Sequence, residues 1–482
     1  MRIANSMSAA RAARAALALA AAAAIPGAAA AQDLSFAGSP EAGAAAALTI
    51  GGLAELRARA YLGEDALRAM GDAADPADAL EAEPSARIDL AFAGASSELE
   101  AKLRVDEAAV AEDPADALEE LCLRAYLGDF VLEAGKMKVV WGKGDKLHVL
   151  DLFNANDYSD FIFPDYIDRR IAEPMARVAW NGPGGARVEA VWTPTMTPDR
   201  VPLEGSWAPA SAAALKEKGE SYVGYLAYSA YGAGGFAGLA AAQAVLDEYA
   251  DASALLPDTR SLDYGQYGIR VTGSLGGVDL GASYYLGRFK TPSVYATYSE
   301  AYHMYTGFEA AYDRLQSFGL EAGTAIGPLN LRGEAAYYLT GDLEGDDPKV
   351  RNGSLDWLAG FDVDLPLSQL NLNLQTVGSY ILGNEGISAA DDVDYDAEGE
   401  YSNDKVVARL SDSLGHEKIL PELALLWGIE REDLVLMPKC AFVLKDDMRL
   451  ELSGAIFLGS GSGEFGAFAE NHFAQARFSY SF

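Results

Sequence analysis

Segments in which apolar and polar residues alternate constrain the fold of this chain most strongly. Between residues 98 and 106, apolar residues such as Leu99, Leu103 and Val105 occupy every second position, and charged residues fill most of the others. Only a β-strand directs alternate side chains to opposite faces, because a helix would scatter the charges around its circumference. The same pattern recurs at 55–61, 86–92, 121–127, 187–192, 277–285, 329–335, 370–375 and 448–453. The sequence therefore predicts an all-β protein.

Two kinds of connection separate these segments. Tight-turn residues occur at 181–185, 232–235, 276–277, 327–328 and 445–447. Long polar connections occur at 64–84, 143–173, 193–219, 246–262, 288–304, 340–354 and 383–417. Short turns at one end and long loops at the other are typical of a transmembrane barrel with periplasmic turns and extracellular loops. A soluble sandwich also alternates, but its strands are usually shorter.

The two ends of the chain carry export signals. Arg2, Arg11 and Arg14 precede a short apolar run and a small-residue stretch at 29–31, the layout of a secretory signal peptide over residues 1–31. At the other end Phe478, Tyr480 and Phe482 occupy alternate positions, and this ending resembles the assembly signal of bacterial outer-membrane proteins. We expect these three residues to share one face of the last strand and to meet lipid.

A barrel that spans a membrane has to close. Backbone N–H and C=O groups at an open sheet edge would find no water in hydrocarbon. The segments match the roughly 9–11 residues that a spanning strand needs. We therefore predict a transmembrane antiparallel β-barrel over residues 32–482 with 14–20 strands, most simply 16 or 18, and at that size the interior is aqueous unless loops fill it.

The region from 135 to 174 resembles a known family. It contains Gly135-Lys136, Trp141-Gly142 and Asp145, then Asp151, Asn154 and Asp157, then Arg170 and Pro174 in fixed spacing. This series, with weaker echoes at 202–207, 331–338 and 357–362, resembles an uncharacterised family of Gram-negative porin-like outer-membrane proteins. The resemblance implies passive or selective transport across the outer membrane.

The connection at 143–173 is a candidate for an inward-folded loop that narrows the lumen. In a channel, opposed acidic and basic groups at such a loop set a transverse field. The candidate constriction residues are Asp145, Asp151, Asp157, Asp165, Asp168, Arg169 and Arg170. A surface loop whose charges only interact with water is the alternative. The first four strands also carry basic residues: Arg57, Arg59, Arg87, Lys102, Arg104 and Arg124. These residues either line the lumen or pair with Glu98, Glu100 and Glu120 across strands.

Composition excludes several other functions. The chain has 37 Lys plus Arg and 71 Asp plus Glu, a formal charge of −34, which argues against a nucleic-acid partner. Two distant Cys and four His show no metal spacing, and no His stands beside an obvious nucleophile, so we expect no metal, no cofactor and no enzyme activity. The acidic stretch at 391–398 lacks the ligand order of a calcium loop, and Ca²⁺ binding there is left open.

These observations predict an outer-membrane porin for small solutes, with cations or neutral solutes favoured by the acidic balance. The alternatives are a gated transporter of hydrophobic, lipid-like solutes and a plugged barrel that serves as an adhesin or anchor. The expected partners are outer-membrane lipid, the solutes themselves and, during biogenesis, periplasmic chaperones and the barrel-assembly machinery. The oligomeric state stays open.

Overall fold

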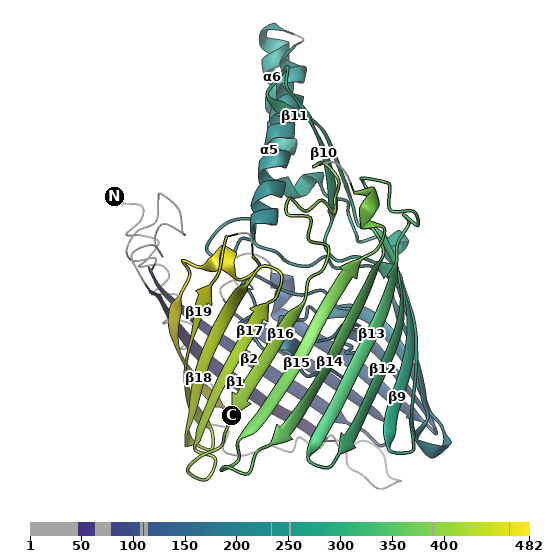
Figure 1. The fold of residues 1–482 in the computed structure, drawn as a ribbon, viewed down its shortest axis with the longest axis vertical. Coiled ribbons are helices and arrows are strands. Elements are labelled where there is room, and N and C mark those ends of the chain that lie inside the picture. The colour runs from purple at the N-terminus through teal and green to yellow at the C-terminus, as the bar shows by residue number, and fades with distance from the viewer. Residues whose placement is uncertain are drawn as a thin grey trace.

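The structure is a closed antiparallel β-barrel of 18 strands (Figure 1). It is a computed structural model, and it describes residues 47–62, 79–106, 109, 114–232, 234–249, 252–387, 390–461 and 463–482. The predicted signal peptide therefore lies outside the described residues. The strand number agrees with the larger of the two preferred values.

The barrel strands follow one another in chain order. Their bounds are β1 Ala47–Tyr61, β2 Leu80–Ala93, β3 Ser97–Val105, β4 Leu118–Leu127, β5 Phe130–Met137, β6 Glu173–Asn181, β7 Arg187–Thr193, β8 Gln266–Leu275, β9 Val278–Arg288, β12 Arg314–Ile326, β13 Leu329–Leu339, β14 Ser354–Asp364, β15 Asn371–Ile381, β16 Lys405–Ser411, β17 Ile419–Gly428, β18 Asp433–Lys445, β19 Met448–Leu458 and β20 Phe473–Ser481. Strands β10 Ser293–Ser299 and β11 Met304–Ala311 form a separate hairpin, so β9 pairs directly with β12.

The last strand closes the barrel against the first. β20 pairs with β1 from Phe473 opposite Tyr61 to Ser481 opposite Leu53. Phe482 continues this ladder, because its N–H donates to the Gly52 carbonyl at 3.1 Å and its carbonyl accepts the Gly52 N–H at 2.9 Å. A Cβ on Gly52 would come within 2.2 Å of the Phe482 ring and 2.8 Å of the Arg87 backbone oxygen, so this position requires glycine. Neither β1 nor β20 is left as a free edge.

Short turns gather at one end of the barrel and long loops at the other (Figure 1). The predicted bounds of some long loops are wrong. The range 383–417 is not one loop, because β16 lies within it; its seven alternating residues are fewer than a typical spanning strand has. The connection 429–432 between β17 and β18 is short although it lies at the long-loop end. Part of the predicted loop 64–84 falls outside the described residues, and β2 already begins at Leu80.

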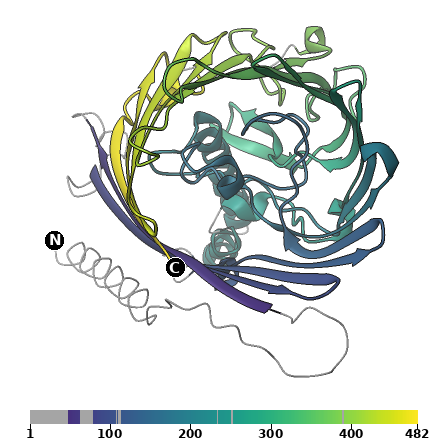
Figure 2. The same ribbon diagram turned by 90° about the horizontal axis from the view of Figure 1, so that it is seen from below.

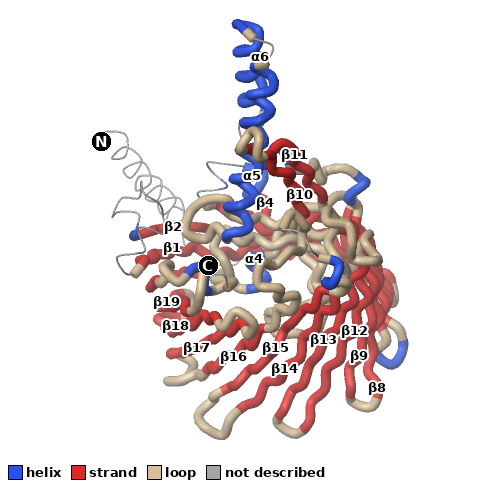
Figure 3. Tube along the Cα trace, turned by 45° about the horizontal axis from the view of Figure 1, so that its top comes forward, coloured by secondary structure: helices blue, strands red, loops and turns tan. Residues whose placement is uncertain are grey.

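A stalk of helices projects from the long-loop end (Figures 1 and 3). It consists of α5 Ala210–Tyr231, α6 Gly235–Glu248 and the β10–β11 hairpin. The glycine turn at 232–235 was predicted to join strands, and this is wrong because it joins two helices. Their alanine-rich sequence favours helix over strand, and 235–246 contains no polar alternation. Short helices elsewhere are α4 Tyr166–Arg169 and 3-10 turns at 114–117, 183–185, 252–255, 262–264, 384–386 and 466–468.

The two faces of the barrel wall differ in chemistry. Apolar side chains stay exposed on the outside, among them Leu123 at 53%, Ile269 at 47% and Leu99 at 41%. The charged residues of the same strands point inward, as shown by their ion pairs across strands. None of the described helices is both long and apolar enough to cross a membrane. An apolar outer band of this extent requires an apolar environment.

Candidate functional site

Residues 138–172, here called the lumen loop, run inside the ring of strands (Figure 2). The loop follows β5 directly after Met137 and returns at Glu173. Asn154 ties both ends together: its Oδ1 accepts the Val139 N–H at 2.8 Å, and its Nδ2 donates to the carbonyls of Met137 at 3.1 Å and Ile171 at 2.9 Å. Asn154 is 1% exposed, so these hydrogen bonds fix the loop where it leaves the wall.

The first half of the lumen loop packs on β8, β9 and β12 through apolar side chains. The rings of Trp141 and Phe153 meet edge to face at 5.1 Å, and Phe153 meets Tyr285 of β9 at 5.2 Å. Gly268 of β8 provides space for them, since a Cβ there would lie 2.6 Å from Phe153 and 2.7 Å from Trp141. These contacts bury Trp141 and Phe153 almost completely. We call this part, residues 139–141 and 149–153, the base of the loop.

The tip of the loop, residues 142–148, is held by one carboxylate on β13. Glu334 Oε1 accepts the backbone N–H groups of Lys143 and Gly144, both at 2.7 Å, and lies 3.0 Å from His148 Nδ1. Its Oε2 accepts the Val149 N–H at 2.8 Å. The Glu334 side chain has no exposed surface. Backbone N–H groups that converge in this way form an anion-binding nest, and here the anion is part of the barrel wall.

Asp145 extends this attachment to β15 and β16. Its Oδ2 accepts hydrogen bonds from Arg409 at 2.8 Å and from Asn373 at 3.0 Å. Its N–H donates to Gln375 Oε1 at 3.0 Å, and Gln375 donates back to the Asp145 carbonyl at 2.9 Å. The tip therefore crosses the lumen from β5 and contacts strands that lie far away along the sheet.

Asp151 and Arg170 form the pair that links the two halves of the loop. Asp151 Oδ1 lies 2.8 Å from Arg170 Nη2, and their side chains are 1% and 4% exposed. Tyr166 donates a hydrogen bond to Asp151, and its ring lies under the Arg170 guanidinium at 5.5 Å. Burial raises the pKa of Asp151, although the charge of Arg170 opposes the shift. A buried pair with these partners serves to fix the loop conformation.

The second half of the loop contacts β1 and β20. Asp160 binds both arginines of β1, with Arg59 Nη1 at 2.5 Å from Oδ1 and with Arg57 at Oδ2. Arg59 is 2% exposed, and its guanidinium lies 4.3 Å from the centre of the Phe473 ring. Around it lies an aromatic cluster made of Tyr61, Phe161, Phe163, Trp207, Phe457, Phe465, Phe468 and Phe473. Together the two halves cross the lumen.

The other candidate constriction residues do not gather into opposed acidic and basic rows. Asp157 lies 2.8 Å from Arg200, and Asp165 lies 2.6 Å from Lys146. Burial favours a raised pKa for Asp165, but the hydrogen bond and the positive charge of Lys146 outweigh the effect of burial. The pKa of Asp165 is therefore lowered. Asp168 is exposed. The Arg169 carbonyl accepts the Asp157 N–H at 2.7 Å, and burial lowers the pKa of the Arg169 guanidinium. Of this set, the structure joins the side chains of Asp151 and Arg170 directly, and it joins Asp157 with Arg169 through the backbone.

The basic residues on the first four strands pair with acidic neighbours. Arg124 lies 2.8 Å from Glu98 and 2.8 Å from Glu133, and Lys102 lies 2.8 Å from Glu120. Arg87 pairs with Asp89 at 3.1 Å. Arg104 pairs with Asp106 at 2.7 Å. The inner face of these strands therefore carries many charged groups, but each positive charge has a negative neighbour and the local net charge is small.

Arg124 begins a longer chain of ion pairs along the inner wall, which sequence reasoning missed. From Glu133 it continues through Arg177 to Glu189 at 3.8 Å, then through Arg270 at 3.3 Å to Glu321 at 2.6 Å. It thus links β3 to β12. The side chains of Arg124, Arg177 and Arg270 remain 27%, 23% and 15% exposed. Water therefore reaches these arginines, whereas the side chains of Glu133, Glu189 and Glu321 are almost completely buried.

A buried lysine supports the loop where it rejoins the wall. Lys290 Nζ lies 3.1 Å from Glu173 Oε1 and 2.8 Å from Gln266 Oε1. Burial lowers the pKa of Lys290, although Glu173 favours its charged form. The amide of Gln266 is further held by the Tyr285 hydroxyl at 2.6 Å. This cluster joins β6, β8 and β9 beside the base of the loop.

The connection between β15 and β16, residues 382–404, gathers acidic groups at the long-loop end. This acidic loop contains eight acidic residues and no basic residue: Glu385, Asp391, Asp392, Asp394, Asp396, Glu398, Glu400 and Asp404. It lies on the neighbouring β13–β14 loop, since Asp394 accepts the Asn352 N–H at 2.7 Å. Arg431 partly compensates for it through ion pairs with Asp396 and Glu398.

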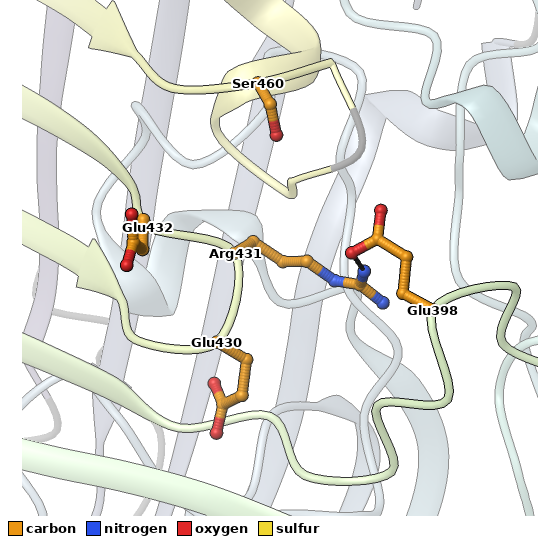
Figure 4. A pocket seen from close by; sticks show the side chains of 5 residues that line it. All are labelled: Glu398, Glu430, Arg431, Glu432 and Ser460. Carbon is orange, nitrogen blue, oxygen red and sulfur yellow. Dashed lines mark hydrogen bonds and ion pairs between the residues drawn. The ribbon is translucent and has the colours of Figure 1, made fainter.

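A pocket of about 460 Å³ opens beside this loop, lined by Glu398, Glu430, Arg431, Glu432 and Ser460 (Figure 4). The Arg431 side chain extends to Glu398, whereas Glu430 and Glu432 leave the backbone in other directions. In the part of the chain that the structure describes, no group of three or more His, Cys, Asp or Glu is arranged to hold a metal ion.

The predicted assembly signal lies on the outside of β20. Phe478 is 39% exposed and stands opposite Leu56 and Leu450, whereas Arg477 points inward to Glu451 at 2.8 Å. The rings of Tyr480 and Phe482 follow on the same face, 6.2 Å apart. The alternation therefore continues to the end of the chain.

Comparisons place the chain in a family. The family described as "Protein of unknown function (DUF1302)" matches residues 126–482, and the chain belongs to it. No curated protein sequence matches. Among solved structures, a BenF-like porin from Pseudomonas fluorescens Pf-5 is similar with a TM-score of 0.47 at 9% identity, over 91% of this chain and 98% of that chain. A mutant of the Rh. blastica porin gives 0.38 at 12% identity, over 90% and 100%. Salmonella typhi OmpF, solved with daunomycin, gives 0.38 at 9% identity, over 91% and 98%.

Proposed function

We propose that this protein is an outer-membrane channel through which small solutes diffuse, and that it favours cations and neutral solutes over anions. The observation that carries the proposal is the contrast between the two faces of the wall. The outside exposes apolar residues such as Leu123, and the inside carries water-accessible ion pairs from Glu98 to Glu321. A barrel built in this way offers a polar path across an apolar layer.

The predicted signal peptide and the C-terminal aromatic residues agree with the same location. The exposed face of Phe478 with Tyr480 and Phe482 would be read during assembly as the last strand, which makes the barrel-assembly machinery a proposed partner in biogenesis. Outer-membrane lipid would then surround the apolar band.

The lumen loop is the proposed constriction. It crosses from β5 to Glu334 and Asn373 on one side and to Arg57 on the other, so solutes would pass between the loop and the wall. The proposed preference for cations comes from the acidic loop at the extracellular mouth, because its eight carboxylates attract positive ions. The ion pairs along the wall contribute less, since most are locally neutral.

Liposome swelling tests the channel directly. Vesicles that contain the refolded barrel are placed in isosmotic solutions of neutral sugars of increasing size. We expect swelling rates that fall steeply with solute size, because the lumen loop narrows the path. Vesicles with heat-denatured protein are the control. Swelling that matches this control for every solute would contradict the proposal and would favour a plugged barrel that acts as an anchor or adhesin.

A transporter of hydrophobic solutes is the second candidate. The observation that favours it is the aromatic cluster around Phe161, Trp207 and Phe457, which lies on the lumen side of β19 and β20. Uptake of a radiolabelled long-chain fatty acid into protein-containing vesicles tests it. Uptake above the rate of protein-free vesicles, without swelling in sugars, would favour this candidate over the channel.

A further inference from the structure

The tip and the base of the lumen loop are attached to the wall by different chemistry. The base packs through buried apolar groups, with Trp141 at 1% and Phe153 at 0% exposure. The tip contacts that core through the apolar side chain of Leu147, and polar groups of the tip bind Glu334, Gln375 and Arg409 of the wall. The buried apolar contacts of the base are lost only when the barrel unfolds. The few polar contacts of the tip can instead be replaced by hydrogen bonds to water while the barrel stays folded.

The polar contacts of the tip depend on a single charged group more than on any other. Glu334 accepts three backbone N–H groups and faces His148, and its carboxylate oxygens are aimed at 142–149. Gly142 makes this approach possible, because a Cβ there would lie 2.3 Å from Glu334 Oε1, and its φ is +115°. Gly144 likewise has no room for a Cβ, which would meet the Leu147 carbonyl at 1.9 Å. The tip is therefore shaped to surround a carboxylate.

We propose that residues 142–148 form a gate within the constriction and that Glu334 is the latch that holds this gate closed against β13–β16. The inference rests on the proposed channel function and adds its regulation. When Lys143 and Gly144 of the tip leave Glu334 and Asp145 leaves Arg409 and Asn373, the lumen beside β14–β16 opens. The base stays on β8, β9 and β12 and, through Val149, on β13. Glu334 acts as a positioning residue, since it acts through the loop.

The substitution Glu334→Gln tests the latch with little change of shape. Both oxygens of Glu334 accept hydrogen bonds from N–H donors, whereas a glutamine turns one of them into an NH₂ group that faces a donor. Loss of a charged acceptor for several N–H groups shifts the gate toward the open state by about tenfold. We expect a rise of that order in open-state occupancy, measured as the open probability in single-channel recordings in planar bilayers.

Glu321→Gln is the matched control. Glu321 stands opposite Glu334 in the β12–β13 register, and both residues are 4% exposed. Glu321 pairs with Arg270 of the wall at 2.6 Å, so its charged partner lies on β8 and not on the lumen loop. Its substitution removes a buried carboxylate from the same part of the lumen without releasing the tip. We expect the open-state occupancy of this variant to match the wild type.

A reversible cross-link separates a gate from general damage to the barrel. Asp145→Cys and Asn373→Cys place thiols where side chains now meet at 3.0 Å, in a chain whose Cys122 and Cys440 are replaced by Ser. Bridging them with a short bis-methanethiosulfonate in the Glu334→Gln background should lower the conductance to the closed level. Cleavage of the bridge with dithiothreitol should raise the conductance again.

The outcomes distinguish the two proposals. Conductance that is equal in wild type, Glu334→Gln and the cross-linked protein would overturn the gate and leave the channel intact. A rise of the open-state occupancy in Glu321→Gln that equals the rise in Glu334→Gln would overturn the latch. The charge of the wall, and not the release of the tip, would then set the conductance. Absence of conductance in every variant, cross-linked or reduced, would overturn the channel and the gate with it.

Discussion

At the scale of single residues, buried charges decide how the lumen loop is held. Arg59 is almost completely buried and is compensated by Asp160 and by Gln475, whose Oε1 accepts from Nη2 at 2.9 Å and from Nε at 3.1 Å. The aromatic rings around it offer cation–π contact but no counter-charge. The loop therefore supplies the charge that a β1 arginine needs inside the barrel.

We expect Asp160→Asn to destabilise the protein by about 3 kcal/mol, because it leaves the buried Arg59 without its counter-charge. Urea unfolding of the barrel in lipid vesicles measures this change. Asp165→Asn is the control: its pair with Lys146 is 59% and 45% exposed, and its loss should cost less than about 1 kcal/mol. Equal effects of the two substitutions would show that Asp160 is not a structural counter-ion.

The partners of individual residues were the least predictable from sequence. The inward side of each strand can be read from alternation, so the pairing of Arg124 with Glu98 was among the expected alternatives. Glu334 stood in one of the alternating segments, but nothing local marks it as the partner of a loop that precedes it by 190 residues in the Gly144 contact. Contacts between a loop and a distant strand depend on barrel closure and register, which the sequence pattern leaves open.

At the scale of elements, the stalk is separate from the barrel wall. Tyr222 of α5 stacks on Phe308 of β11 at 6.0 Å, and the Ser221 hydroxyl accepts the Tyr305 N–H at 3.1 Å. These contacts hold the stalk together. The glycine-rich connection that joins its helices was interpreted as a strand turn, since glycine marks turns between strands and turns between helices alike.

Replacing residues 211–248 by a short Gly-Ser linker should leave the barrel assembled, because the strand ladder of the barrel does not include them. Heat-modifiable migration in cold gel electrophoresis tests whether the barrel is folded. Liposome swelling tests whether solutes still pass through it. A variant that fails to show the folded band would contradict this separation and would make the stalk part of the folding unit.

At the scale of the whole molecule, the closed antiparallel barrel was predictable because two-faced strands, sorted connections and the terminal Phe482 agree with one another. The strand count was less certain because short strands such as β16 have weak patterns. The sequence predicts the net charge of the protein but not how the charges are distributed over it. The formal charge of −34 does not reveal that the wall pairs its charges while the acidic loop concentrates eight carboxylates at one mouth.

The reversal potential of single channels in a KCl gradient tests the account most directly. A barrel with a polar lumen and an acidic mouth should carry an ion current, with a reversal potential whose sign indicates preference for K⁺ over Cl⁻. Substitution of Asp391, Asp392 and Asp394 by Asn should reduce that preference. A barrel that migrates as folded but carries no current above that of the protein-free bilayer would contradict the account.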